Sequence, residues 1–221
     1  MSPSTTFEGC DTAWSHDLAN VVDGVYATNG HLIDHRRRFP WLQGFLGNPD
    51  ARVWFVAWYP STRAVERIHS SSATCESQWL ATEGDRIFRR NLVRVGFKTG
   101  TIDSPGGWKC YITDLVKADA PPSEWDSTSA ATRKKAYETW LPVLDWEFRH
   151  GQPRLVVAVG KDVNRRLDDI WPFLQKASRR PLDRAVIWHY AFFNRGGDSA
   201  VNRTKYAKQF DDVVRKARQL K

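Results

Sequence analysis

The sequence predicts an α/β fold: a single three-layer αβα domain in which helices cover both faces of a central four-stranded parallel sheet. Four short runs rich in β-branched and aromatic residues recur along the chain, and segments with helical periodicity separate them. Strands that alternate with helices form parallel sheets joined by right-handed crossovers. With 221 residues, 41% of them hydrophobic, the chain can bury one core, and residues 1–221 are expected to form one domain.

The first expected element is a helix at about 12–26, which together with the segment HRRRFPW (35–41) covers an outer surface within residues 1–50. The core is expected to span residues 51–203. Its strands are predicted at 52–58, 109–115, 154–160 and 184–190, and its helices at about 78–95, 131–150 and 160–170. A basic amphipathic helix at about 203–219, within the C-terminal segment 203–221, closes the chain.

The charge of the chain favours a polyanionic partner. Lys and Arg together number 33 and Asp and Glu 25, which gives a net charge of +8 at pH 7. Eleven Trp residues add rings that can stack on bases, although a basic protein with aromatic residues in its core is the alternative. We therefore expect nucleic acid as the partner.

Several other classes of protein are disfavoured. No apolar run has the length of a membrane span, and the first residues form neither a basic leader nor an apolar signal segment, so a cytoplasmic protein with no membrane partner is expected. Cys10, Cys75 and Cys110 are too few and too far apart to indicate a disulfide framework or a metal site. The chain also lacks the Gly-rich motifs of dinucleotide and P-loop enzymes.

Five segments near the expected strand ends resemble the motifs of the uracil-DNA glycosylase superfamily, in order, over most of residues 50–200. They are AWYPS (57–61), WLATEGDRIFRRNL (79–92), YITDLVK (111–117), YETWLPVLDWEFRHGQPRLVVAVGKDVNRRL (137–167) and VIWHYAFFNRGG (186–197). The resemblance implies a monofunctional DNA glycosylase, which extrudes a base and hydrolyses its N-glycosidic bond. On this interpretation Trp58, Tyr59 and Trp79 bind the base, but each could equally be a core aromatic residue.

The chain departs from the superfamily at positions that bear on the substrate. Trp58 and Tyr59 stand where a water-positioning carboxylate or amide is common, which disfavours ordinary uracil excision. Asp114 stands where the superfamily has Asn, and a carboxyl group suits the amine edge of cytosine better than the O4 edge of uracil. Ser61 occupies a gate position at which a small residue leaves room for a substituent at C5. These residues together favour a cytosine-type base modified at C5, such as glucosylated hydroxymethylcytosine in viral DNA.

The remaining expected site residues follow from the same resemblance. His189 would donate a hydrogen bond to the base O2, and Asp114, if protonated in a dry pocket, would act as the general acid. Glu66, Glu83 and Asp85 are conceivable water-positioning groups, but carboxylates at a helix start are more often solvated or capping. Phosphate contacts are expected from Ser61, Lys117, Lys161 and Arg195, although Lys117 and Arg195 could equally be solvated and Gly160-Lys161 could be no more than a tight turn. The loop from Asn194 to Gly197 is expected to bind DNA by pressing on the duplex where the base has been removed.

The expected enzyme is a monomer that acts on double-stranded or single-stranded DNA, for repair or antiviral defence, without a metal or a cofactor. Two other interpretations remain open. One is a non-catalytic DNA-binding module of the same fold that recognises modified or damaged bases. The other is an unrelated α/β hydrolase or nucleotide enzyme whose strand ends have a similar pattern by chance.

Overall fold

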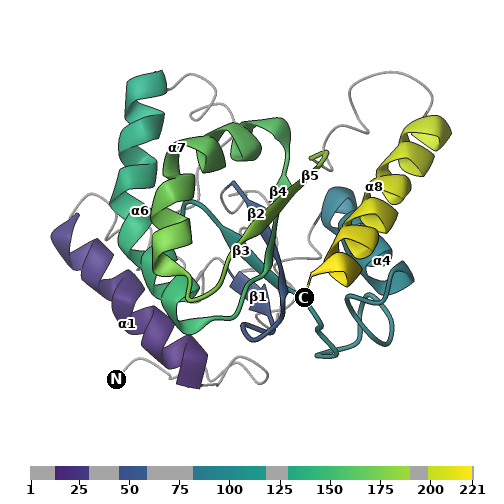
Figure 1. Cartoon of the computed structure of the whole chain (residues 1–221), viewed down its shortest axis with the longest axis horizontal. Coiled ribbons are helices and arrows are strands. Elements are labelled where there is room, and N and C mark those ends of the chain that lie inside the picture. Colours follow the sequence, from purple (N-terminus) through teal and green to yellow (C-terminus); the bar gives the residue numbers. More distant parts are fainter. Residues whose placement is uncertain (1–12, 30–44, 59–81, 118–128, 190–198, 221) are drawn as a thin grey trace.

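The computed structural model describes residues 13–29, 45–58, 82–117, 129–189 and 199–220. Within these ranges a sheet lies between two groups of helices (Figure 1). One face packs against α1 (Ala13–Thr28), α6 (Ala130–His150) and α7 (Lys161–Ala177). The other face packs against α4 (Glu83–Arg94) and α8 (Ser199–Gln219). The α/β class is confirmed, and helices lie at each of the five expected places.

The sheet has five strands in the order β1-β3-β2-β4-β5, which corrects the prediction of four. The four predicted strands are the parallel ones: β2 (Val53–Ala57), β3 (Tyr111–Asp114), β4 (Leu155–Val159) and β5 (Asp183–Ile187). The additional strand, β1 (Phe45–Gly47), pairs antiparallel with β3 at the edge of the sheet. It has three residues, too few for an apolar alternation that could be recognised in the sequence.

Helix α7 is longer than expected. The sequence predicted an end near residue 170, but the helix continues through Pro172 to Ala177. Leu174 and Ala177 are buried in the core cluster on this face of the sheet. Burial of these two side chains offsets the loss of one helical hydrogen bond at Pro172. Tertiary packing therefore extends the helix past a proline that, by its local preference, would end it.

Alternation along β2 and β3 decides which face each strand residue occupies. Ala57 pairs in register with Asp114 and belongs to the cluster under α4 and α8, as does Ile112. Tyr111 belongs to the cluster under α1, α6 and α7. Because successive side chains point to opposite faces, Thr113 faces α6 and Asp114 faces α4 and α8. The last two residues of β3 therefore place polar groups on opposite faces of the sheet.

No helix in the described ranges is long and apolar enough to cross a membrane.

Candidate functional site at the carboxyl ends of the parallel strands

The carboxyl ends of the four parallel strands meet at one edge of the sheet. Backbone pairing between β2 and β3 continues beyond the strands, because the N–H groups of Leu115 and Val116 donate to the carbonyls of Ala57 and Trp58, both at 3.0 Å. At the end of β4, the N–H of Gly160 donates to the carbonyl of Ile187 at 2.8 Å. In open α/β sheets this edge is where ligands bind, so it is the first place to look for a site.

Asp114 is the most unusual group at this edge. Its side chain is 1% exposed, and its Oδ2 atom is buried with no hydrogen-bond partner. Burial raises the pKa of this carboxyl from 3.8 to about 8, an effect that the charge of Lys117 opposes and the charges of Glu147 and Asp85 reinforce. At neutral pH the carboxyl is therefore protonated, so it can donate a hydrogen bond as well as accept one.

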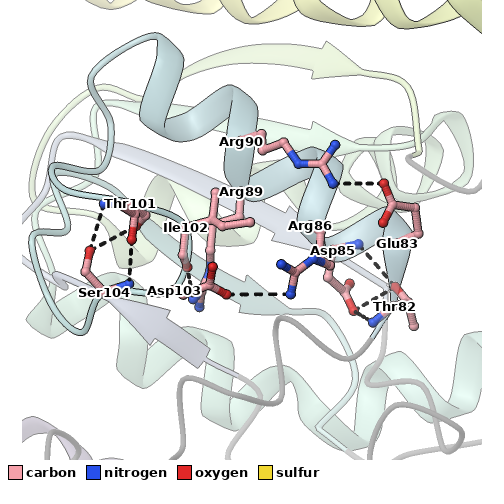
Figure 2. A network of polar contacts seen from close by, with 10 residues as sticks. All are labelled: Thr82, Glu83, Asp85, Arg86, Arg89, Arg90, Thr101, Ile102, Asp103 and Ser104. Atoms are coloured by element: carbon pink, nitrogen blue, oxygen red, sulfur yellow. Dashed lines mark hydrogen bonds and ion pairs between the residues drawn. The ribbon is translucent and has the colours of Figure 1, made fainter.

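Asp85 lies in the first turn of α4 and is only 6% exposed. Its Oδ2 accepts hydrogen bonds from the backbone N–H of Thr82 at 2.9 Å and from the Thr82 hydroxyl at 2.7 Å, while its own N–H donates to that hydroxyl (Figure 2). This reciprocal arrangement is a capping box. Glu83, the other acid of this turn, is exposed and pairs with Arg90 at 2.9 Å. Of these two candidate water-positioning groups, Asp85 alone is buried.

Lys117 lies in a buried polar cluster on the α6 side of the sheet, which we call the Glu147 cluster: Trp14, Tyr111, Thr113, Lys117 and Glu147. The side chains of Lys117 and Glu147 are both 0% exposed, with Nζ 3.0 Å from Oε2. The hydroxyls of Tyr111 and Thr113 donate to Glu147 Oε1 at 2.7 and 2.8 Å. Lys117 also donates to the Thr113 hydroxyl, and Trp14 Nε1 donates to the Tyr111 hydroxyl at 3.2 Å.

This burial does not fit the expected phosphate contact of Lys117, because its ammonium group is enclosed and already bound to a carboxylate. Sequence reasoning also missed Glu147. A signal was present, since Glu147 lies on the apolar stripe of its helix with Trp140, Val143 and Leu144, all of which are buried. An acid at a core position requires a buried partner, and Lys117 supplies it.

Trp58 and His189 lie at the same edge but in different surroundings. The ring of Trp58 is half-buried against the α1, α6 and α7 cluster and makes an edge contact with Tyr137, with centroids 5.5 Å apart. This position agrees with the core interpretation of Trp58. His189 is exposed and lies over Gly160, where an added Cβ would be 3.3 Å from the His189 Cβ. Lys161 is exposed at the start of α7, next to this glycine.

Gly160 is required at the junction of β4 and α7. Its φ angle of +108° is a conformation that residues with a side chain rarely adopt, and the absence of Cβ lets His189 pack against it. The other expected site residues, Tyr59, Ser61, Trp79, Asn194 and Arg195, lie outside the described residues, as does Glu66.

A groove of about 630 Å³ lies between the C-terminal ends of α4 and α8. It is lined by Arg94, Val95, Asp211, Val214, Arg215, Arg218 and Gln219. Arg94 pairs with Asp211 at 2.8 Å, and Arg215 pairs with Asp212. Lys117 and Lys161, the expected DNA-binding residues that the structure describes, do not line this groove, so we treat it as separate from the candidate site.

Two other features bear on the chemistry of the site. In the described ranges, no three His, Cys, Asp or Glu side chains are grouped so that they could hold a metal ion. Cys110 is a free thiol, and burial raises its pKa. An un-ionised thiol is a poor nucleophile, which makes Cys110 unsuited to covalent catalysis. Cys10 and Cys75 lie outside the described residues.

No family model matches the chain, and no curated protein matches it. The site is therefore interpreted from its own chemistry.

Proposed function

We propose that this protein is a DNA glycosylase that extrudes a cytosine-type base modified at C5, hydrolyses its N-glycosidic bond and leaves an abasic site. One observation carries the proposal: the carboxyl of Asp114 is buried at the strand ends and one of its oxygens has no hydrogen-bond partner. Burial raises the pKa of this carboxyl to about 8, which favours its protonated form at neutral pH. A protonated carboxyl can donate to cytosine N3 and accept from its N4 amine at the same time. The motif resemblance and the net charge of +8 support DNA as the polymer that carries the base.

The reaction follows from the role of Asp114 as an acid. Cytosine is a poor leaving group, so Asp114 transfers its proton to N3 as the bond between C1′ and N1 breaks. The electron pair of that bond moves onto the departing base, and C1′ acquires oxocarbenium character. Water then adds its oxygen to C1′ and returns a proton to the Asp114 carboxylate. The products are the free base and an abasic deoxyribose, and the enzyme is regenerated.

His189 is expected to stabilise the base as charge builds on it. His189 lies beside Gly160 at this edge, and the residue is exposed. The variant His189→Ala should lower turnover by about 10²–10³-fold, because a donor of this kind acts mainly in the transition state. DNA affinity should change little. Single-turnover cleavage and equilibrium binding measure the two effects separately, and unchanged turnover would remove His189 from the reaction.

DNA affinity is expected to depend strongly on salt. Lys and Arg side chains that contact phosphates release counterions, so the affinity should fall at least about tenfold between 50 and 200 mM salt. Fluorescence anisotropy with one labelled duplex at several salt concentrations measures the slope. A flat slope would mean that the positive charge of the chain does not contact phosphates.

The decisive experiment incubates the protein with DNAs that carry cytosine, hydroxymethylcytosine, glucosylated hydroxymethylcytosine or uracil at one position, followed by alkali treatment. Alkali-labile breaks at the modified cytosines would support the proposal. Tight and selective binding without breaks would favour the DNA-binding module instead. Neither breaks nor DNA affinity would favour an unrelated α/β enzyme.

A further inference from the structure

One side chain of α6 is bonded to the chain on both sides of Asp114. The carboxylate of Glu147 accepts hydrogen bonds from the hydroxyls of two earlier residues, Tyr111 at 2.7 Å and Thr113 at 2.8 Å. It also pairs with the ammonium group of a later residue, Lys117, whose Nζ lies 3.0 Å from Oε2 and 3.2 Å from Oε1. Glu147 therefore ties the chain to the same helix before and after Asp114.

These ties lie on the face of the sheet opposite to the Asp114 side chain. Thr113 faces α6, where it meets Glu147, and Asp114 faces α4 and α8, because successive strand residues alternate. After Asp114, the N–H groups of Leu115 and Val116 donate to carbonyls of the neighbouring β2 segment, both at 3.0 Å. The backbone that carries the Asp114 carboxyl is thus held by β2 along the sheet and by Glu147 from the α6 side.

An ion pair in this part of the core carries an energetic cost. Lys117 and Glu147 are both 0% exposed, and taking two charges out of water offsets much of their attraction. Apolar side chains of similar volume often give an equally stable core, but they fix its arrangement less closely. Hydrogen bonds, in contrast, require a narrow range of distances and angles. Compared with an apolar cluster of the same size, the Glu147 cluster therefore restricts the position of the end of β3 more than it stabilises the fold.

We propose that Glu147 is a positioning residue: its bonds to Thr113 and Lys117 hold the end of β3 so that the Asp114 carboxyl stays in one place. The consequence for catalysis rests on the proposed function, because Asp114 is the acid of that reaction. The ordering of the segment itself does not depend on it. A general acid must lie within about 0.5 Å of its working position, and a misplacement of about 1 Å can lower the rate about 10²-fold.

The test is amide hydrogen exchange in the double variant Lys117→Met/Glu147→Leu, which removes both charges and fills a similar volume. The reporters are the N–H groups of Leu115 and Val116, and the reference is the set of N–H groups of β4, which pairs with a strand on each side. The two reporters should exchange about tenfold faster, both in absolute rate and relative to β4. A loss of global stability alone cannot raise the rate relative to β4, so the two measures together detect local opening.

A milder variant and a matched control complete the test. Thr113→Val removes one tie but keeps the ion pair and nearly the same shape, and it should speed exchange of the reporters about threefold. This variant decides alone if the double variant does not fold. The control Lys134→Met/Glu138→Leu removes an exposed ion pair of 3.9 Å from the same helix and should leave the reporters unchanged. Unchanged reporters in the variants of the cluster overturn the inference, and so does an equal change in the control.

Cleavage measurements separate the inference from the proposed function. At saturating DNA, the double variant should cleave about 10²-fold more slowly while its affinity for DNA stays close to that of the wild type, because only the acid is displaced. Wild-type cleavage by a variant with faster exchange overturns the positioning role. Faster exchange in a protein whose wild type cleaves no DNA retains the ordering of β3 by Glu147 and overturns the glycosylase proposal. Cleavage by a protein whose reporters are insensitive to the cluster does the reverse.

Discussion

The variant Asp114→Asn is expected to lose cleavage of cytosine-type substrates by about 10²–10⁴-fold, the usual contribution of a general acid. The amide has nearly the size and shape of the carboxyl, and the carboxyl it replaces is uncharged at neutral pH, so folding should be preserved. An amide cannot supply a proton of carboxylic-acid strength. It can, however, donate to O4 and accept from N3–H of uracil, so binding to uracil-containing DNA should improve.

Paired single-turnover and binding measurements on matched duplexes test this expectation. The control is the variant Asp183→Asn. Asp183 is an exposed acid at the first residue of β5, at the edge of the sheet away from the candidate site, so this variant should cleave DNA at the wild-type rate. If Asp114→Asn processes the cytosine substrate at the wild-type rate, Asp114 does not read the base. The modified-cytosine proposal then loses its main support.

The proton on Asp114 also predicts the direction of two pH effects. Cleavage should be level at neutral pH and decline as the pH rises through about 8, where the carboxyl ionises. The pKa of Asp114 is higher in the folded state than its ordinary value of 3.8, so the unfolded state loses this proton first as the pH rises. The contribution of Asp114 to the free energy of unfolding is therefore full below about pH 4 and is lost as the pH rises to about 8. Relative to Asp114→Asn, the wild type should lose roughly 5 kcal/mol over this interval. Urea unfolding of both proteins across the interval measures the difference.

Lys117→Met should destabilise the fold by about 3–5 kcal/mol, because it leaves the carboxylate of Glu147 buried without its cation. Methionine fills much of the same volume, so lost packing contributes little. The double variant Lys117→Met/Glu147→Leu removes both charges and should recover a large part of the loss. Denaturant unfolding measures all three proteins against the wild type.

The matched control is Lys134→Met on the same helix as Glu147. Lys134 pairs with Glu138 at 3.9 Å, and both side chains are mostly exposed. Removing this lysine should cost less than about 1 kcal/mol, since exposed ion pairs of this spacing contribute little. A Lys117→Met variant as stable as Lys134→Met would show that the buried pair is not needed for the fold.

Much of the fold was predictable because its signals are local. The run VWFVAW predicted β2 by its β-branched and aromatic residues, and RLVVAVG predicted β4 followed by a turn at Gly160. Helix α4 carries a buried stripe that a 3.6-residue periodicity reveals. The three-residue strand β1 carries no such signal, and neither does the extension of α7 beyond Pro172, because neighbours distant in sequence stabilise both.

The candidate site also has some features that the local sequence predicts and others that only the folded structure sets. The sequence by itself determined the residue types available at the strand ends, including an acid at position 114 in place of an amide, and so determined which chemistry was worth considering. Only the tertiary structure decided that one oxygen of Asp114 is buried without a hydrogen-bond partner and that Lys117 is buried in an ion pair with Glu147. It also decided that Trp58 packs against Tyr137. The buried ion pair joins Lys117 to Glu147, 30 residues further along the chain, and no local pattern encodes such a contact.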